Sequence, residues 1–300
     1  MTLRKKRLHA SALLVALVGL LLITAGCDNP VRTRAQPVDD PTPSDNWPDD
    51  VTWTHVWGDE FDYQGALNGS KWTFETGGGG WGNQELQYYT DRRENTRVDG
   101  DHLIIEARRE SYGGNQYTSA RINSAASWTY GRFEIRARLP EGLGTWPALW
   151  MLASQDTYGD AYWPDNGEID IMEHVGYDPG IVHATVHTEA YNHADGTEVG
   201  ASKQVPDATD AFNVYAIEWT PDEIRAYVNG EQYFSFANER QVSSSATYEE
   251  WPFDKPFHLL MNIAVGGTWG GAQGVNPDAF PATMAIDYVR VYQPESLVND

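Results

Sequence analysis

The stretch Gly167-Glu168-Ile169-Asp170-Ile171-Met172-Glu173 decides the fold, because its alternating acidic and apolar residues are typical of a β-strand. Glu168 and Asp170 are two residues apart and would share one face of a strand, whereas a helix would separate them by about 200°. Glu173 lies at an odd spacing, and one extra residue near Met172, a β-bulge, would return it to that face. Carboxylates that share a face raise one another's pKa, which suits one acid and one base near neutral pH.

The alternative for this stretch is an edge strand whose acidic residues are merely solvated. Ile169, Ile171 and Val175 argue against it, because they give the strand an apolar face opposite the acids. A strand of this kind packs on one side and presents its carboxylates on the other. We therefore expect Glu168, Asp170 and Glu173 to perform chemistry.

Period-two alternation continues through most of the chain from Val51 onward. Asn229-Gly230 is a strong hairpin signal between two such runs, because both residues tolerate a positive φ. No long segment has a helical repeat, and many short strands separated by glycine, proline and asparagine predict an all-β sandwich of two antiparallel sheets. The expected strands cover residues 53–61, 102–109, 117–125, 133–139, 181–188, 212–219, 224–228, 232–236, 257–265 and 284–292.

The N-terminal residues have the pattern of a targeting segment. A basic run, Arg4 to Arg7, precedes an apolar run that is too short for a membrane span. Small residues then lead to Cys27, the single cysteine, which predicts a lipoprotein signal with lipid on its sulfur. Thr24 stands where such signals usually have leucine, so ordinary secretion remains an alternative, as does an incidental cysteine. The predicted segments are a signal peptide (1–26), a disordered acidic, proline-rich tether (27–50), a folded domain (51–294) and a tail (295–300).

The charge of the chain is strongly negative. Its 43 acidic and 21 basic residues give a formal net charge of −22. Phosphate would be repelled, so we expect no nucleic-acid partner, and self-repulsion favours a monomer. The same composition fits either a high-salt habitat or an ordinary acidic secreted protein. The expected location is outside the cytoplasm, as an envelope lipoprotein or a secreted protein, with membrane contact only through the lipid anchor.

Aromatic residues are abundant, with 12 Trp and 16 Tyr. Most are expected in the core, but Trp81 and Trp269 are flanked by glycines and should be exposed on loops. Trp146, Trp150 and Trp163 precede the carboxylate strand. Indole rings in such places stack on the apolar faces of sugar rings, so we expect Trp146, Trp150 and Trp269 to face a ligand.

Four motifs together resemble glycoside hydrolase family 16, and within it the laminarinase-like endo-β-1,3-glucanases. The resemblance covers Val51 to Gln293. The motifs are the carboxylate stretch, Trp81-Gly82-Asn83-Gln84-Glu85-Leu86-Gln87-Tyr88-Tyr89-Thr90, Gly144-Thr145-Trp146-Pro147-Ala148-Leu149-Trp150 and Asp287-Tyr288-Val289-Arg290-Val291-Tyr292. The Glu-x-Asp-x-x-Glu form is the family's bulged variant.

The resemblance implies a β-jelly-roll with a long concave cleft and a retaining double displacement. It implies Glu168 as nucleophile, Glu173 as general acid/base and Asp170 as a helper between them. It also places a histidine such as His187 near the cleft floor. Further implied sugar-binding residues are Trp146, Trp150, Trp163, Trp269, Asn83, Glu85 and Arg121, although Arg121 could equally be a surface ion-pair partner.

No cofactor is implied for catalysis, but many relatives bind a structural calcium ion away from the cleft. Its oxygen ligands would come from Glu60, the backbone near Gly100, and Asp287, and oxygen donors suit a hard cation. A solvated acid at the start of a strand is the alternative for Asp287.

The leading hypothesis is endo-acting hydrolysis of β-1,3-glucan of the laminarin type. Cleavage of mixed β-1,3/1,4-glucan or of a galactan within the same family is the alternative enzyme activity. A non-catalytic glucan-binding module is the alternative of a different class. Such modules typically lack one or both glutamates, whereas Glu168 and Glu173 are both present.

Overall fold

The computed structural model describes residues 52–298. The predicted signal peptide (1–26), the lipidation site Cys27 and the tether to residue 50 lie outside the described residues. Between residues 52 and 298, no helix has the length and apolar character needed to cross a membrane.

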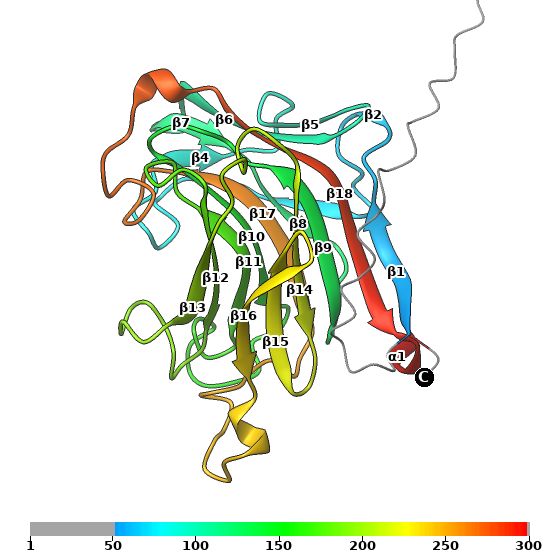
Figure 1. The fold of residues 1–300 in the computed structure, drawn as a ribbon. Coiled ribbons are helices and arrows are strands. Elements are labelled where there is room, and N and C mark those ends of the chain that lie inside the picture. The colour runs from blue at the N-terminus through cyan, green and yellow to red at the C-terminus, as the bar shows by residue number, and fades with distance from the viewer. Residues whose placement is uncertain (1–51, 299–300) are drawn as a thin grey trace, which may run out of the picture. The chain divides into compact units, whose positions relative to one another are not determined.

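The described residues form two packed sheets, as the sequence predicts (Figure 1). The seven-stranded sheet is antiparallel throughout, and β11 lies near its middle. Its order is β13 (Val199–Gln204), β12 (Ile181–His187), β11 (Glu168–His174), β10 (Thr145–Ala153), β17 (Phe257–Val265), β8 (Arg121–Ser124) and β3 (Trp72–Glu75).

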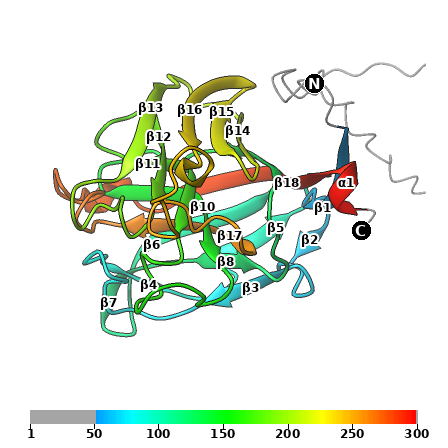
Figure 2. The ribbon, with the colours of Figure 1, turned by 90° about the horizontal axis from the view of Figure 1, so that it is seen from below.

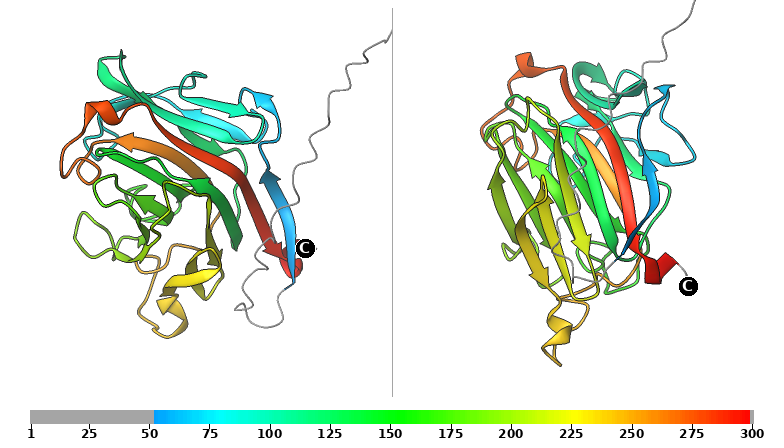
Figure 3. Two further views of the ribbon diagram at one scale, coloured as in Figure 1. Left: turned by 45° about the horizontal axis from the view of Figure 1, so that its top comes forward. Right: turned by 45° about the vertical axis from the view of Figure 1, so that its right-hand side comes forward.

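The second sheet has eleven strands and covers the inner face of the first. Its main path is β16 (Glu231–Ala237), β15 (Glu223–Val228), β14 (Asn213–Trp219), β9 (Gly131–Arg138), β18 (Ala282–Pro294), β6 (Leu103–Tyr112), β5 (Thr96–Asp99) and β2 (Gln64–Gly65). Off this path, β1 (Trp53–Asp59) pairs with β18, β7 (Asn115–Ser119) pairs with β6, and β4 (Gln87–Tyr89) pairs with β7 in parallel. Figure 3 shows the curvature of these layers, with the red β18 beside the blue β1.

Helical structure in residues 52–298 is confined to short pieces: η1 (Glu239–Gln241), η2 (Pro277–Ala279) and α1 (Glu295–Val298). α1 begins the segment that the sequence predicts as a tail. The Glu295 amide donates to the Thr52 carbonyl at 3.0 Å, which joins the two ends of the described chain (Figure 2).

Alternation along the strands of the seven-stranded sheet separates a core face from an outer face. On β10, Leu149 and Met151 are fully buried in the core, while Trp146 and Trp150 lie on the other face and line a cleft. β12 repeats the pattern, with its core residues alternating with cleft residues. The sheet therefore carries a row of polar and aromatic side chains on one face, as period-two strands require.

The predicted hairpin joins β15 and β16. Asn229 and Gly230 have φ values of 51° and 79°, as a tight hairpin turn of this kind needs. The single strand predicted over 117–125 is wrong, because the chain breaks at Ala120: β7 belongs to one sheet and β8 to the other. β10 is not among the expected strands, and it contains Pro147, which cannot donate to a ladder. It is tolerated where β10 pairs with β17 alone, since pairing with β11 begins at Ala148.

Candidate active site

β11 contains the β-bulge that the spacing of its acids predicts. Relative to both β10 and β12, β11 has one extra residue between Asp170 and Glu173. Ile171 and Met172, although adjacent, are both fully buried in the core. Because two successive residues point inward, Glu173 returns to the face of Glu168 and Asp170.

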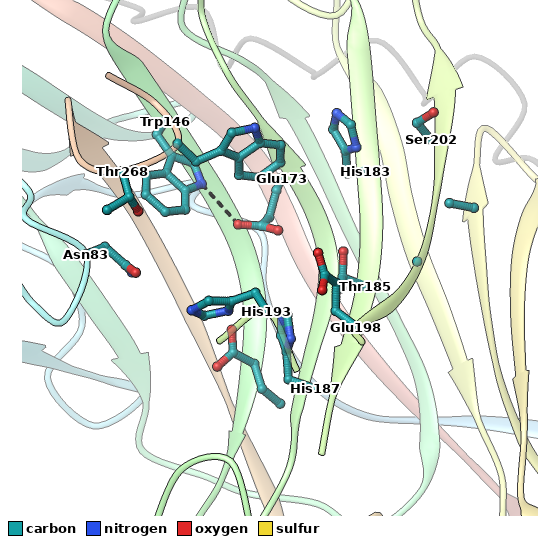
Figure 4. Close-up of a pocket in the computed structure, with 14 residues that line it drawn as sticks. Asn83, Trp146, Glu173, His183, Thr185, His187, His193, Glu198, Ser202 and Thr268 are labelled. Carbon is teal, nitrogen blue, oxygen red and sulfur yellow. Dashed lines mark hydrogen bonds between the residues drawn. The ribbon is translucent and has the colours of Figure 1, made fainter. Parts of the chain in front are cut away.

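Each of the two glutamates accepts a hydrogen bond from the indole N–H of a different tryptophan. Trp163, in the loop before β11, donates from Nε1 to Oε2 of Glu168 at 2.8 Å. Trp146, on β10, donates from Nε1 to Oε1 of Glu173 at 3.0 Å (Figure 4). Each carboxylate is thus oriented by its own donor, from a different element of the fold.

Asp170 lies between the glutamates in sequence and is only 3% exposed. Its Oδ2 is 3.3 Å from Nε2 of His187 on β12, an ion-pair distance, but the two atoms are not aligned as a hydrogen bond. One ligand atom from each of Glu168, Asp170 and His187 lies within 4.8 Å of the other two. His187 therefore lies beside both Glu168 and Asp170 on this side of the cluster.

Burial is the largest cause of raised pKa values in this cluster. It raises the pKa of Glu168 to about 8 and that of Glu173 to about 7, and it also raises the pKa of Asp170. The negative charge of neighbouring carboxylates adds to the effect, whereas the indole donors and His187 oppose it. Although both glutamates border an open cleft, protein surrounds their carboxyl groups. The cluster therefore retains at least one proton at pH 7.

The carboxylate face opens into two adjoining cavities of about 630 and 380 Å³. One extends over β12 and β13, and the other extends over β10, β17 and β8. Both are lined by Asn83, Trp146, Glu168, Glu173 and His193, so they form one cleft that crosses the sheet on both sides of β11. An extended polymer could lie across the strands with its middle at the carboxylates.

The sequence profile of the glycosyl hydrolases family 16 matches residues 81–290. The chain belongs to this family. The enzyme is 64% identical over 244 residues to the beta-glucanase of Rhodothermus marinus, covering 80% of this chain and 85% of that protein. The X-ray structure of the laminarinase from Rhodothermus marinus superposes with a TM-score of 0.81, covering 81% of this chain and 98% of that one at 64% identity.

A more distant relative is the glucan endo-1,3-beta-glucosidase A1 of Niallia circulans. It is 39% identical over 261 residues, which cover 80% of this chain and 38% of that protein. The fold of this glycoside hydrolase is accordingly the jelly roll expected from the sequence.

All eight residues predicted to bind sugar line the cleft of this family 16 enzyme. Trp146 and Asn83 border both cavities. Glu85, Arg121, Trp150 and Trp163 border the smaller one, and His187 and Trp269 the larger. Their roles in binding stay predictions.

Arg121 is both a cleft residue and an ion-pair partner. Its guanidinium carbon lies 4.9 Å from the ring centre of Trp81 and 4.6 Å from that of Trp150. Its Nε is 2.5 Å from Oε2 of Glu75. The two indole rings, through cation–π contacts, and the Glu75 carboxylate, through the ion pair, together hold the guanidinium against the cleft wall.

A hydrogen-bonded chain connects Glu85 to Trp150. Gln87 and Tyr89 donate to Oε2 of Glu85 at 2.5 and 3.2 Å. Asn262 donates to the Tyr89 hydroxyl at 3.1 Å and accepts from Nε1 of Trp150 at 2.8 Å. Glu85 is largely buried, and this raises its pKa. Glu85 therefore supports the cleft wall as well as bordering it.

Trp269 packs against two other aromatic rings of the cleft, one from β10 and one from β12. Its ring centre is 5.6 Å from that of Trp146 and 5.0 Å from that of His183, both with edge-to-face geometry. The glycine-rich loop that carries Trp269 thereby packs against the indole that donates to Glu173.

His193 is a cleft residue that sequence reasoning missed. Its ring lies 4.9 Å from that of Trp163 and 5.1 Å from that of His187, and Figure 4 shows it beside His187. It lies in a turn, where no periodic signal marks an orientation. Asn262 was also missed, but it is a polar residue within the apolar strand β17, a signal that could have been used.

The three residues predicted to bind calcium lie on β18 and directly after two other strands of the same sheet: β1, which pairs with β18, and β5, which is separated from β18 by β6. Asp287 is 6% exposed and occupies the point where the partner strand on one edge of β18 changes from β6 to β1. Glu60 directly follows β1, and Gly100, with a φ of 108°, directly follows β5. Arg290 binds both carboxylate oxygens of Glu60, at 2.9 and 3.1 Å, and Arg136 holds Oδ2 of Asp287 at 2.6 Å. Because Arg290 already binds the Glu60 carboxylate, we expect Glu60 to bind an ion through its backbone carbonyl instead.

Proposed function

We propose that this family 16 enzyme is an endo-acting, retaining β-1,3-glucanase. The observation that carries the proposal is the pair of buried glutamates on one face of the bulged strand β11, each bound by its own indole donor. The cleft continues on both sides of the pair, which suits attack within a chain rather than at its end.

In the first step, Glu168 attacks the anomeric carbon of the sugar on one side of the scissile bond. The bond from that carbon to the glycosidic oxygen breaks as the bond to the Glu168 carboxylate forms. Glu173 gives its proton to the departing oxygen. This division of roles is that of a retaining glycosidase, in which a carboxylate attacks directly.

In the second step, water attacks the same anomeric carbon and the ester bond to Glu168 breaks. Glu173 takes a proton from that water, since esterification has removed the charge of Glu168 and lowered the pKa of Glu173. Two inversions leave the product with its original configuration. Asp170, with His187 beside it, would keep the Glu168 carboxylate oriented during both steps.

The names of the relatives support β-glucan as the substrate class. The 64% identical protein is called a beta-glucanase, its structure a laminarinase, and the Niallia circulans relative a glucan endo-1,3-beta-glucosidase. Mixed-linkage glucan and a galactan are alternative substrates within the family. A binding module is disfavoured because both glutamates are present and paired with donors.

The test is the product profile of the purified protein on laminarin, mixed-linkage glucan and agarose, each at low and high salt. We expect short oligosaccharides from laminarin early in the reaction, and NMR should show that the β-anomer forms first. Exposed Glu141→Gln is the matched control for Glu168→Gln. Release of only monosaccharide, or of the α-anomer first, would contradict the endo-acting retaining mechanism. Products from agarose alone would contradict the substrate class.

We further propose a structural calcium ion at the edge of β18, held by backbone carbonyls near Glu60 and Gly100 together with the Asp287 carboxylate. The support is the chemistry of this donor set, since carbonyl and carboxylate oxygens are the ligands calcium prefers. The ion would tie β1 and the turn after β5 to β18 and has no part in catalysis.

We also propose export, with a lipid on Cys27 and otherwise no membrane contact. The support is the sequence of residues 4–27. Mass spectrometry of the mature N-terminus should find a lipidated Cys27, and an unmodified residue 27 would leave ordinary secretion. Elution of the soluble protein as a monomer would agree with its net charge of −22.

A further inference from the structure

A second kind of chemistry is available in the carboxylate cluster. Glu168, Asp170 and His187 can each direct one ligand atom so that all three lie within 4.8 Å of one another. They come from two neighbouring strands, β11 and β12, and Glu168 is directly opposite His187 in the ladder. Strand pairing therefore fixes the spacing of two of the three groups.

One atom in the middle of this group is incompletely satisfied. Oδ2 of Asp170 is buried and has no aligned hydrogen bond among the described residues; Nε2 of His187 is 3.3 Å away as an ion-pair partner, and Glu168 is the hydrogen-bond partner of the Asp170 side chain. The side chain of Asp170 is only 2% exposed and that of His187 only 7%. A buried carboxylate oxygen without a donor is costly, and a cation placed between these groups would satisfy it.

The donor set indicates which cation this would be. One imidazole nitrogen with two carboxylate oxygens suits Zn²⁺, Co²⁺ or Cu²⁺, whereas Ca²⁺ and Mg²⁺ prefer sites made of oxygen alone. Three protein ligands leave further coordination positions for water from the adjoining cleft. Glu173, on the same face, is a further carboxyl group near the three ligands.

We propose that Glu168, Asp170 and His187 form a binding site for a borderline divalent transition-metal ion such as Zn²⁺. The bound ion occupies the carboxylate of Glu168 and excludes the sugar from the centre of the cleft. Metal ion and glucan chain therefore compete, and the ion acts as a reversible inhibitor. Binding of the ion does not depend on the proposed hydrolysis; only its inhibitory effect rests on the proposed role of Glu168.

The test uses the full-length protein, freed of metal with a chelator and kept in excess CaCl₂ so that the proposed calcium site stays filled. Titration with CoCl₂ should produce visible absorption bands of a nitrogen- and oxygen-bound ion, and calorimetry with ZnCl₂ should give one site per chain. His187→Gln and Asp170→Asn should each weaken binding at least tenfold. His183→Gln is the matched control, because His183 lies on the same strand and borders the same cavity outside the cluster.

A second measurement needs no variant. A laminarin oligosaccharide should displace Co²⁺ from the wild-type protein, and ZnCl₂ should raise the apparent KM in steady-state assays while leaving kcat unchanged. The proposal is overturned if no saturable site appears in the presence of calcium, if His187→Gln and Asp170→Asn bind as tightly as His183→Gln, or if the oligosaccharide leaves the cobalt spectrum unchanged. A protein that binds Co²⁺ in this way but cleaves no glucan would contradict the proposed function alone.

Discussion

Replacing Trp163 by phenylalanine removes one hydrogen bond and little else. The indole N–H that donates to Glu168 at 2.8 Å is lost. An aromatic ring remains in place to contact His193, whose ring centre is 4.9 Å away, and to border the cleft. The substitution therefore tests whether the donor supports the charge of the proposed nucleophile.

The size of the effect follows from the chemistry of the lost bond. A hydrogen bond to a charged group contributes about 1.5–3 kcal/mol. At about 1.4 kcal/mol for each pKa unit, its loss should raise the pKa of Glu168 by roughly one to two units beyond the value that burial already imposes. The reactive form, with Glu168 ionised and Glu173 protonated, should become about 10 to 100 times rarer at neutral pH, which lowers kcat/KM by the same factor.

The assay is a pH profile of kcat/KM on soluble laminarin for three matched variants. Trp163→Phe should lower the maximum and move the midpoint of the profile to higher pH. Trp146→Phe removes the donor to Glu173, so it should also move the midpoint to higher pH, but without the same fall, because a raised pKa of Glu173 favours the reactive form. Trp150→Phe is the control, since its N–H binds Asn262 instead of a catalytic carboxylate.

Two results would refute this reasoning. One is a Trp163→Phe enzyme whose profile keeps its midpoint while only KM rises, which would make Trp163 a sugar platform and no more. The other is an equal fall in all three variants, which would indicate a general disturbance of the cleft. Melting temperatures of the variants should be compared first, so that a loss of folded protein is not taken for a loss of rate.

Other expected outcomes can be measured independently. Glu168→Gln and Glu173→Gln should each lower kcat at least 100-fold on laminarin, and retention of near-wild-type turnover would be incompatible with their roles. Both variants should melt at or above the wild-type temperature at pH 8, because burial raises these pKa values in the folded state and ionisation between about pH 4 and pH 8 costs stability. The wild-type kcat/KM should be bell-shaped, rising through about pH 7 and falling through about pH 8, whichever glutamate carries the shared proton; a flat profile from pH 5 to 9 would contradict the raised values. A calcium chelator should lower the melting temperature of the wild type but hardly that of Asp287→Asn, and no change in either would remove the calcium proposal. Arg121→Ala should raise KM with little change in kcat, and an unchanged KM would show that Arg121 serves its ion pair alone.

Local spacing was sufficient to predict the central part of this site. The separation of Glu168, Asp170 and Glu173 allows one strand arrangement in which all three share a face, and that arrangement needs the bulge observed at Ile171 and Met172. The Asn229-Gly230 hairpin was predictable for a similar reason, since its conformation is decided by two adjacent residues.

Features that depend on residues distant in sequence were not predictable in this way. The break at Ala120 sends β7 and β8 into different sheets, although residues 117–125 contain no glycine or proline that would mark a break. His193 enters the cleft from a turn, and only the packing of Trp163 and His187 around it determines its position. The motifs mark Trp146 and Trp163 as cleft residues, but not that each indole N–H reaches one particular glutamate.

The two glutamates are chemically identical and lie on the same strand, so their different roles must come from their surroundings. Glu168 is next to Asp170 and His187 and accepts from Trp163, in the loop before β11. Glu173, beyond the bulge, accepts from the Trp146 indole. In the strand ladder His187 lies directly opposite Glu168, whereas Glu173 lies opposite His183. The bulge thus does more than restore a face: it places the two glutamates beside different donors and opposite different residues of β12, and so separates the attacking carboxylate from the proton donor.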